Sequence, residues 1–176
     1  MQANANIDFS TIDWHSVSEE KAKFIYNEAI EHHQGIIANN NRISDKALGM
    51  LSFTMPVMAA LVGYFAISWG NVAPSLFLAA VSACVFLFGI LFLLLLIIIP
   101  RGINEGAGSP SAYFTDDYYK RNMRELYVGN IVNIQSSIAI ARKVMKKRGL
   151  YFKIAVILCA VFPAVSFLAF LFGLRC

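Results

Sequence analysis

The densest cluster of charge in this chain is a basic run in its C-terminal third. The run consists of Arg142, Lys143, Lys146, Lys147 and Arg148. Basic side chains grouped in this way attract phosphate, so the run predicts a site for an anionic ligand, such as a nucleotide or an oligonucleotide. The alternative is that these cations contact anionic lipid headgroups and set the orientation of the chain in a membrane.

A second group combines small and hydroxyl-bearing residues within an otherwise apolar segment. Its members are Ser52, Thr54, Ala59, Gly63 and Ser68. Hydroxyl groups can line a pore. Two small residues four positions apart, here Ala59 and Gly63, let membrane helices approach each other closely. The group therefore predicts either a pore lining or a plain helix-packing face.

Residues typical of an enzyme form no recognisable set in this sequence. Of its three histidines, His32 and His33 are adjacent and would point in different directions from a helix, so they do not predict a shared metal site. The sequence has no P-loop and no dinucleotide-binding fingerprint. Cys84 and Cys159 lie among apolar residues, where cysteine acts as a small hydrophobic side chain. We expect no enzyme activity, no metal and no cofactor.

The apolar segments that carry these residues are long enough to cross a lipid bilayer. No charged residue occurs between Lys46 and Arg101, or between Lys153 and Arg175. One crossing needs about 20 mostly apolar residues. The first segment therefore contains two spans, which we divide at the turn-forming residues 69–74. The sequence predicts an all-α membrane protein with spans over 49–68, 75–99 and 150–174.

The flanking charges predict how these spans are oriented. Four Lys and Arg residues precede the first span, ten lie from Arg101 to Lys153, and the 69–74 turn has none. Positive charge favours the cytoplasmic side, so we expect a cytoplasmic N-terminus and an outer C-terminus. The uncharged stretches 47–100 and 154–174, which make up nearly all of the spans, contain no ionisable Asp, Glu, Lys, Arg or His. This argues against a proton- or ion-coupled transporter.

The two charged regions are predicted to form long amphipathic helices, because apolar residues recur in them at steps of three and four. The first helix would begin at a capping box formed by Ser16 and Glu19. The second would follow a Gly-, Ser- and Pro-rich loop, with Thr115 or Asp116 as its cap and Gly149 as its joint to the last span. The expected core positions are Ile25, Ile36, Ile43, Ile131, Ile134 and Ile138.

Neither apolar stripe can remain in water, so we expect the two helices to pack on each other as a cytoplasmic bundle. Polar residues on or beside the stripes would set their register; these are His32, Asn39, Asn40, Asn130 and Gln135. Two helices make a thin bundle, which predicts a homo-oligomer. The resulting division is 1–17 polar segment, 18–48 helix, 49–100 transmembrane hairpin, 101–149 loop and helix, and 150–174 third span.

Short motifs accompany this order of elements. They are Ile43 to Gly49 at the start of the first span, Ile99-Pro100-Arg101 at the end of the second, and Tyr113-Phe114 before the second cytoplasmic helix. Over about residues 20–174 the chain resembles the transmembrane effectors of the Pycsar antiphage systems. It is also similar to the SLATT-type effectors of nucleotide-signalling defence. The resemblance implies a bacterial inner-membrane protein that is triggered by a nucleotide made by a partner enzyme, or by a partner protein.

The function expected from these features is that of an oligomeric effector of abortive-infection defence that permeabilises the membrane when it is triggered. The alternative is a membrane anchor without a pore, whose cytoplasmic helices recruit a soluble partner. A membrane enzyme is disfavoured because the catalytic groups are missing.

Overall fold

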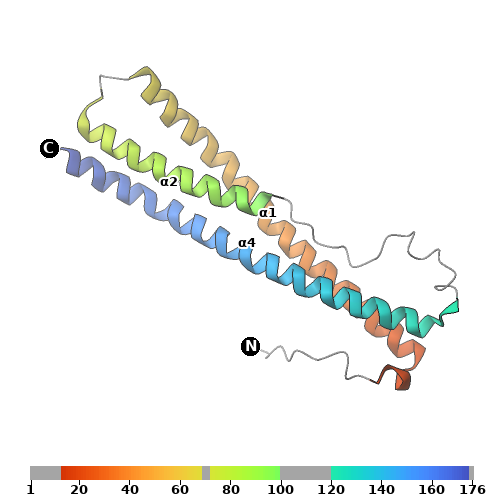
Figure 1. The fold of residues 1–176 in the computed structure, drawn as a ribbon. Coiled ribbons are helices and arrows are strands. Elements are labelled where there is room, and N and C mark those ends of the chain that lie inside the picture. Colours follow the sequence, from red (N-terminus) through yellow and green to blue (C-terminus); the bar gives the residue numbers. More distant parts are fainter. Residues whose placement is uncertain (1–12, 69–71, 100–119, 175–176) are drawn as a thin grey trace. The chain divides into compact units, whose positions relative to one another are not determined.

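A computed structural model of the chain describes residues 13–68, 72–99 and 120–174. The regular elements in these residues are all helical (Figure 1): the short 3₁₀ helix η2 (Trp14–Ser16), α1 (Glu19–Ile67), α2 (Pro74–Ile98) and α4 (Met123–Gly173). The predicted all-α class is confirmed. Three of these helices are long and apolar enough to cross a membrane. The predicted loop at 102–111 and residues 69–71 of the predicted turn lie outside the described residues.

The two charged regions are parts of longer helices and are not separate elements, as the sequence allows for the first region, which can run without a break into the first span. α1 continues from its charged half into its apolar half without a break, and α4 does the same. The predicted joint at Gly149 is therefore wrong, because α4 passes through this residue as regular helix. A glycine costs a helix interior only about 1 kcal/mol relative to alanine, which packing of the flanking turns readily offsets.

The N-termini of the two long helices are capped by residues other than those expected. Ser18 caps α1, since its Oγ accepts a hydrogen bond from the Lys21 amide at 3.4 Å. Ser16 belongs to η2 and donates its hydroxyl to the Asp13 carbonyl at 2.8 Å, so the predicted Ser16–Glu19 capping box is wrong. In α4, Asn122 Oδ1 accepts from the Glu125 amide at 3.0 Å. The expected caps Thr115 and Asp116 lie outside the described residues.

The chain divides into two compact units. Unit 1 comprises Met1–Ala38 with Gly102–Lys143, and unit 2 comprises Asn39–Arg101 with Val144–Cys176. In unit 1, α1 and α4 pack with the rings of Tyr26 and Tyr127 at a centroid distance of 5.4 Å. The buried side chains of this helix pair are Ala22, His33, Ile36, Ile131, Ile134, Ser137, Ile138 and Ala141.

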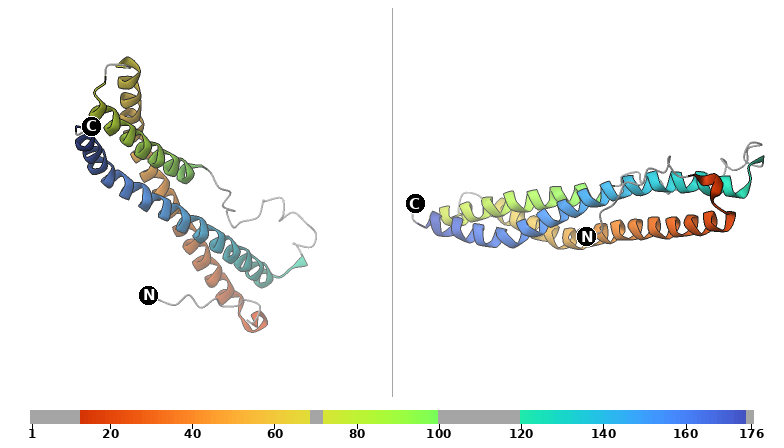
Figure 2. Two further views of the ribbon diagram at one scale, coloured as in Figure 1. Left: turned by 60° about the vertical axis from the view of Figure 1, so that its left-hand side comes forward. Right: turned by 90° about the horizontal axis from the view of Figure 1, so that it is seen from below.

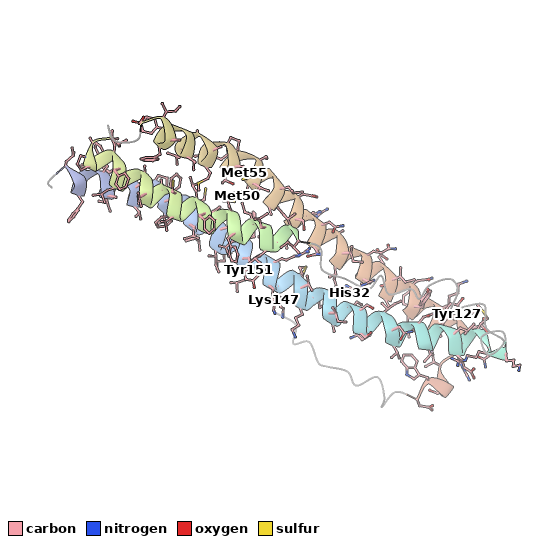
Figure 3. The ribbon with its side chains drawn as sticks, turned by 45° about the horizontal axis from the view of Figure 1, so that its top comes forward. His32, Met50, Met55, Tyr127, Lys147 and Tyr151 are labelled. Atoms are coloured by element: carbon pink, nitrogen blue, oxygen red, sulfur yellow. The ribbon has the colours of Figure 1, made fainter. Side chains whose placement is uncertain are left out.

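Unit 2 contains all of α2, together with α1 from Asn39 onward and α4 from Val144 onward. α2 runs antiparallel to α4, as the views in Figures 1 and 2 show. The Ser82 hydroxyl lies 3.3 Å from that of Ser166, near the middle of this helix pair. The core of the unit is an apolar cluster of Ala47, Ile90, Leu94, Ile97 and Ala155. Met50 of α1 and Tyr151 of α4 pack against this cluster (Figure 3).

Candidate functional site

The predicted basic run separates into exposed and buried members. Lys143, Lys146 and Lys147 are exposed on α4, and Lys147 is labelled in Figure 3. Arg148, in contrast, is only 5% exposed, so it does not belong to an exposed anion-binding surface as expected. The reason is helical rotation: position 148 lies seven residues before the buried Ala155 and therefore on the same face of α4.

Arg142, the remaining member of the run, belongs to unit 1 and contacts α1. Its Nη2 lies 2.6 Å from Nε2 of His32. A guanidinium group can only donate hydrogen bonds, so His32 Nε2 is the acceptor in this pair. Arg142 is half-buried, and this bond joins the two helices of unit 1 beside their apolar seam.

The buried Arg148 belongs to a group of polar side chains that we call the polar layer: Asn40, Ser44 and Arg148, all in unit 2. Arg148 Nη2 donates to the Ile99 carbonyl at 3.0 Å, and Nη1 donates to Ser44 Oγ at 3.3 Å. Ser44 Oγ donates in turn to the Asn40 carbonyl at 3.4 Å. The Asn40 side chain is 1% exposed, and its Oδ1 has no hydrogen-bond partner among the described residues.

The polar layer borders the apolar cluster of unit 2. Ser44 lies three residues before Ala47, and Ile99 lies two residues after Ile97. The sequence pattern pointed to Asn40 as a seam residue but did not identify Ser44 or Arg148. The run of basic residues does not show which member faces the interior, because its sequence alone does not indicate which face of α4 packs against the other helices.

The predicted pore-lining or packing residues differ in burial: Thr54 is buried, whereas Ser52 and Ala59 are exposed. The Ser52 hydroxyl donates to the Gly49 carbonyl at 2.9 Å, and the buried Thr54 hydroxyl donates to the Met50 carbonyl at 3.0 Å. Both hydroxyls therefore bond to the backbone of their own helix. Ser68 is half-buried.

The small pair Ala59 and Gly63 lies open in this chain. Ala59 is exposed, and a Cβ built on Gly63 would have no atom within 4 Å. The close helix approach occurs instead at Gly173, where a Cβ would lie 2.5 Å from Ser75 Cα. Sequence spacing could not find this contact, because it joins one residue from each of two helices that are far apart in the chain.

Five of the six expected bundle-core residues are buried or half-buried, but they divide between the two units. Ile36, Ile131, Ile134 and Ile138 are buried in unit 1. Ile43 belongs to unit 2, where it packs against the apolar cluster.

The sixth, Ile25, is 37% exposed and is not a core residue. Tyr26 takes its place in the seam, where it contacts Tyr127. The same shift by one residue buries His33 rather than His32, and Asn40 rather than Asn39. Each shift rotates the position by about 100° around the helix, which is enough to move a side chain out of the seam.

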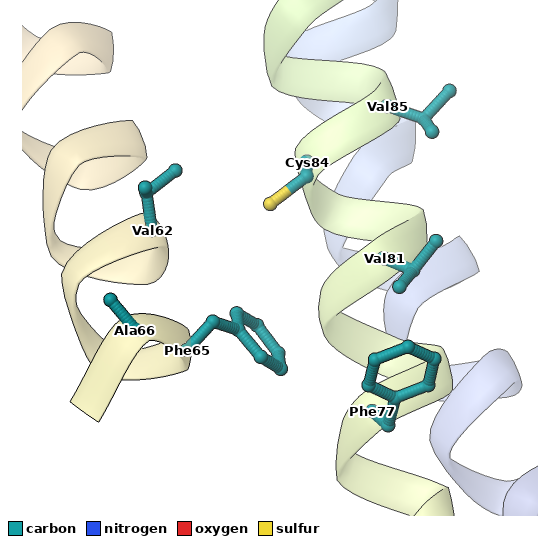
Figure 4. Close-up of a pocket in the computed structure, with 7 residues that line it drawn as sticks. All are labelled: Val62, Phe65, Ala66, Phe77, Val81, Cys84 and Val85. Carbon is teal, nitrogen blue, oxygen red and sulfur yellow. The ribbon is translucent and has the colours of Figure 1, made fainter. Parts of the chain in front are cut away.

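An apolar pocket of about 580 Å³ lies between the end of α1 and the start of α2 (Figure 4). The rings of Phe65 and Phe77 meet edge-on in it, with centroids 6.1 Å apart. Its lining residues are Val62, Phe65, Ala66, Phe77, Val81, Cys84 and Val85. The pocket therefore suits hydrocarbon and offers no group that would hold a charged ligand.

The described residues contain no group of three or more His, Cys, Asp and Glu side chains that could hold a metal ion. No protein family, curated protein or solved structure was found to match this chain. The features that bear on its function are therefore the helix pair of unit 1, the exposed lysines of α4 and the polar layer of unit 2.

Proposed function

We propose that this chain is an oligomeric membrane effector of bacterial antiphage defence, which permeabilises the membrane when its extramembrane helices receive a nucleotide signal or a partner protein. One observation carries this proposal: α1 and α4 both continue unbroken from the helix pair of unit 1 into the apolar segments of unit 2. A ligand that moves the helix pair would therefore act on two of the three apolar segments directly.

The composition of the apolar segments supports permeabilisation rather than coupled transport. These segments contain no ionisable Asp, Glu, Lys, Arg or His between 47 and 100 or between 154 and 174. The residues Ala47, Ile90, Leu94, Ile97 and Ala155, from all three helices, are fully buried. A water path through several copies of the chain is therefore more consistent with this packing than a path through one copy.

The direction of insertion and the site of the signal form the second part of the proposal. The excess of Lys and Arg before residue 47 and from 101 to 153 favours a cytoplasmic location for unit 1 in the bacterial inner membrane. On α4, Lys146 and Lys147 are exposed and adjacent. We propose that these two lysines contact the anionic signal, with Arg148 excluded because its guanidinium is buried.

The test is membrane permeability measured with the full-length chain. Proteoliposomes that hold a self-quenched dye and a potassium gradient are exposed to cyclic mononucleotides, cyclic dinucleotides and linear oligonucleotides in turn. In parallel, bacteria expressing the chain are infected with phage and followed with a potential-sensitive dye. We expect depolarisation before lysis and fewer plaques. An intact barrier in both systems would reject the proposal.

A membrane anchor that recruits a soluble partner is the second candidate function. The observation in its favour is a set of large apolar side chains on the surface of unit 1, including Phe24 (64% exposed), Val132 (46%) and Ile140 (47%). Such side chains favour protein contacts. A monomeric or dimeric particle in detergent with no axial path would favour the anchor, whereas a ring with an axial path would favour the permeabilising effector.

A further inference from the structure

Unit 2 holds the charged side chain of Arg148 in its interior. This side chain is 5% exposed, although its neighbours Lys146 and Lys147 are exposed. Burying a guanidinium group is costly unless hydrogen bonds replace those it made with water. The hydrogen bonds that Arg148 makes in the interior therefore indicate its structural role.

The first contact closes the end of α2. Ile99 is the C-cap residue of this helix, and its carbonyl accepts from Arg148 Nη2 at 3.0 Å. The carbonyls of a last helical turn have no partner within the helix, and apolar surroundings supply no water to satisfy them. A cation at this position also interacts favourably with the negative end of the helix dipole. Arg148 thus caps α2 from a neighbouring helix.

The second contact joins the same side chain to α1. Arg148 Nη1 donates to Ser44 Oγ at 3.3 Å. The planar guanidinium presents several N–H groups in a fixed arrangement, so one side chain can serve two acceptors at once. A single residue of α4 therefore ties the end of α2 to α1.

The Ser44 hydroxyl also links the guanidinium to the backbone of α1. Its Oγ accepts from Arg148 Nη1 and donates to the backbone carbonyl of Asn40. Ser44 therefore joins Arg148 to the turn of α1 that begins at Asn40.

We propose that Arg148 is a latch that holds the C-terminal end of α2 against α1 and α4, and that this end of α2 separates from them when the guanidinium leaves the Ile99 carbonyl. The latch goes beyond the proposed function, because it concerns the movement of α2 whether or not the membrane becomes permeable. Its test therefore measures the protection of backbone amides at the end of α2 and not the permeability of the membrane.

The test is amide hydrogen exchange of the full-length chain in lipid nanodiscs. Arg148→Met keeps a long unbranched side chain and removes the donors. We expect residues 95–99 to exchange at least about tenfold faster in this variant, the scale of losing a hydrogen bond to a charged group. Arg148→Lys keeps the charge and donors on a single nitrogen but lacks the planar fork that spans both acceptors, so it should restore part of the protection. The matched control is Lys153→Met, which removes an exposed cation from the same helix.

Unchanged exchange at 95–99 in Arg148→Met would overturn the latch. Faster exchange spread equally over α2, α4 and unit 1 would also overturn it, because Arg148 would then support the whole fold rather than one helix end. If Arg148→Met does not fold, Ser44→Ala decides: it removes one of the two acceptors and should raise exchange several-fold at 95–99. No local change in that variant would likewise contradict the latch.

Discussion

Asn39 and Asn40 show how strongly the environment of a residue depends on its place around a helix. The two are adjacent and chemically identical, but Asn39 is exposed and Asn40 is 1% exposed. The Asn40 Oδ1 has no hydrogen-bond partner within the described part of the chain. A buried acceptor without a hydrogen bond lowers the stability of the folded state that buries it.

The first residue-scale prediction is that Asn40→Leu raises the thermal stability of the resting protein. Leucine has a similar volume and removes the unsatisfied amide, so we expect a gain of about 1–3 kcal/mol in the free energy of unfolding. The measurement is the midpoint of thermal unfolding in detergent. Asn39→Leu is the control and should change stability by less than about 0.5 kcal/mol. A lower midpoint for Asn40→Leu would mean that the amide has a partner, such as a bound water or a second copy.

At the scale of elements, the described part of unit 1 consists mainly of one helix pair, and its seam is made of few side chains. Ile134 and Ile138 are buried on α4, whereas Ile140 on the same helix is 47% exposed. The Tyr26–Tyr127 contact and the Arg142–His32 bond lie in the same pair. Because the helices of this pair continue into the apolar segments, the integrity of the seam should matter more than that of the outer face.

The element-scale prediction compares Ile134→Asp with Ile140→Asp. A carboxylate at the buried position loses its hydration, so we expect Ile134→Asp to separate α1 and α4 in unit 1 and to speed proteolysis of this unit by at least about tenfold. Ile140→Asp should leave proteolysis nearly unchanged. Equal resistance of both variants would contradict the seam. A smaller detergent particle for Ile140→Asp alone would show that the exposed face contacts a second copy.

At the scale of the whole chain, α1 and α4 each carry both a charged segment and a candidate membrane span. The proposed function uses this continuity, and the proposed signal site uses the exposed Lys146 and Lys147. The same lysines would suit anionic headgroups, each such cation contributing about 1 kcal/mol near a membrane surface. Binding to lipid headgroups would be observed without the trigger, whereas the signalling role would be observed only when the trigger is present.

The whole-molecule prediction is that the double variant Lys146→Glu with Lys147→Glu loses its response to the trigger. We expect binding of a fluorescent oligonucleotide probe to weaken at least tenfold, and the salt dependence of binding to become less steep. The double variant Lys21→Glu with Lys23→Glu has the same change of charge on exposed residues of α1 and serves as the control. An unaltered response would leave these lysines with the lipid role alone, which a vesicle co-sedimentation assay measures separately.

The sequence by itself determined the helical class, the three apolar segments and most of the seam in unit 1. These are properties of composition and period: a long uncharged run needs a membrane-like environment, and apolar residues at steps of three and four need a helical partner. Ile36, Ile131, Ile134 and Ile138 follow from that pattern without knowledge of the fold.

Only the tertiary structure decided which of two neighbouring residues is buried and which residues far apart in the chain meet. Tyr26 replaces Ile25 and His33 replaces His32, because a shift of one residue turns a side chain by about 100° and the partner helix selects the register. Arg148 faces inward for the same reason. Its bond to Ile99 and the close approach of Gly173 to Ser75 arise where α2 and α4 pack, and no local pattern of residues encodes a contact between two helices.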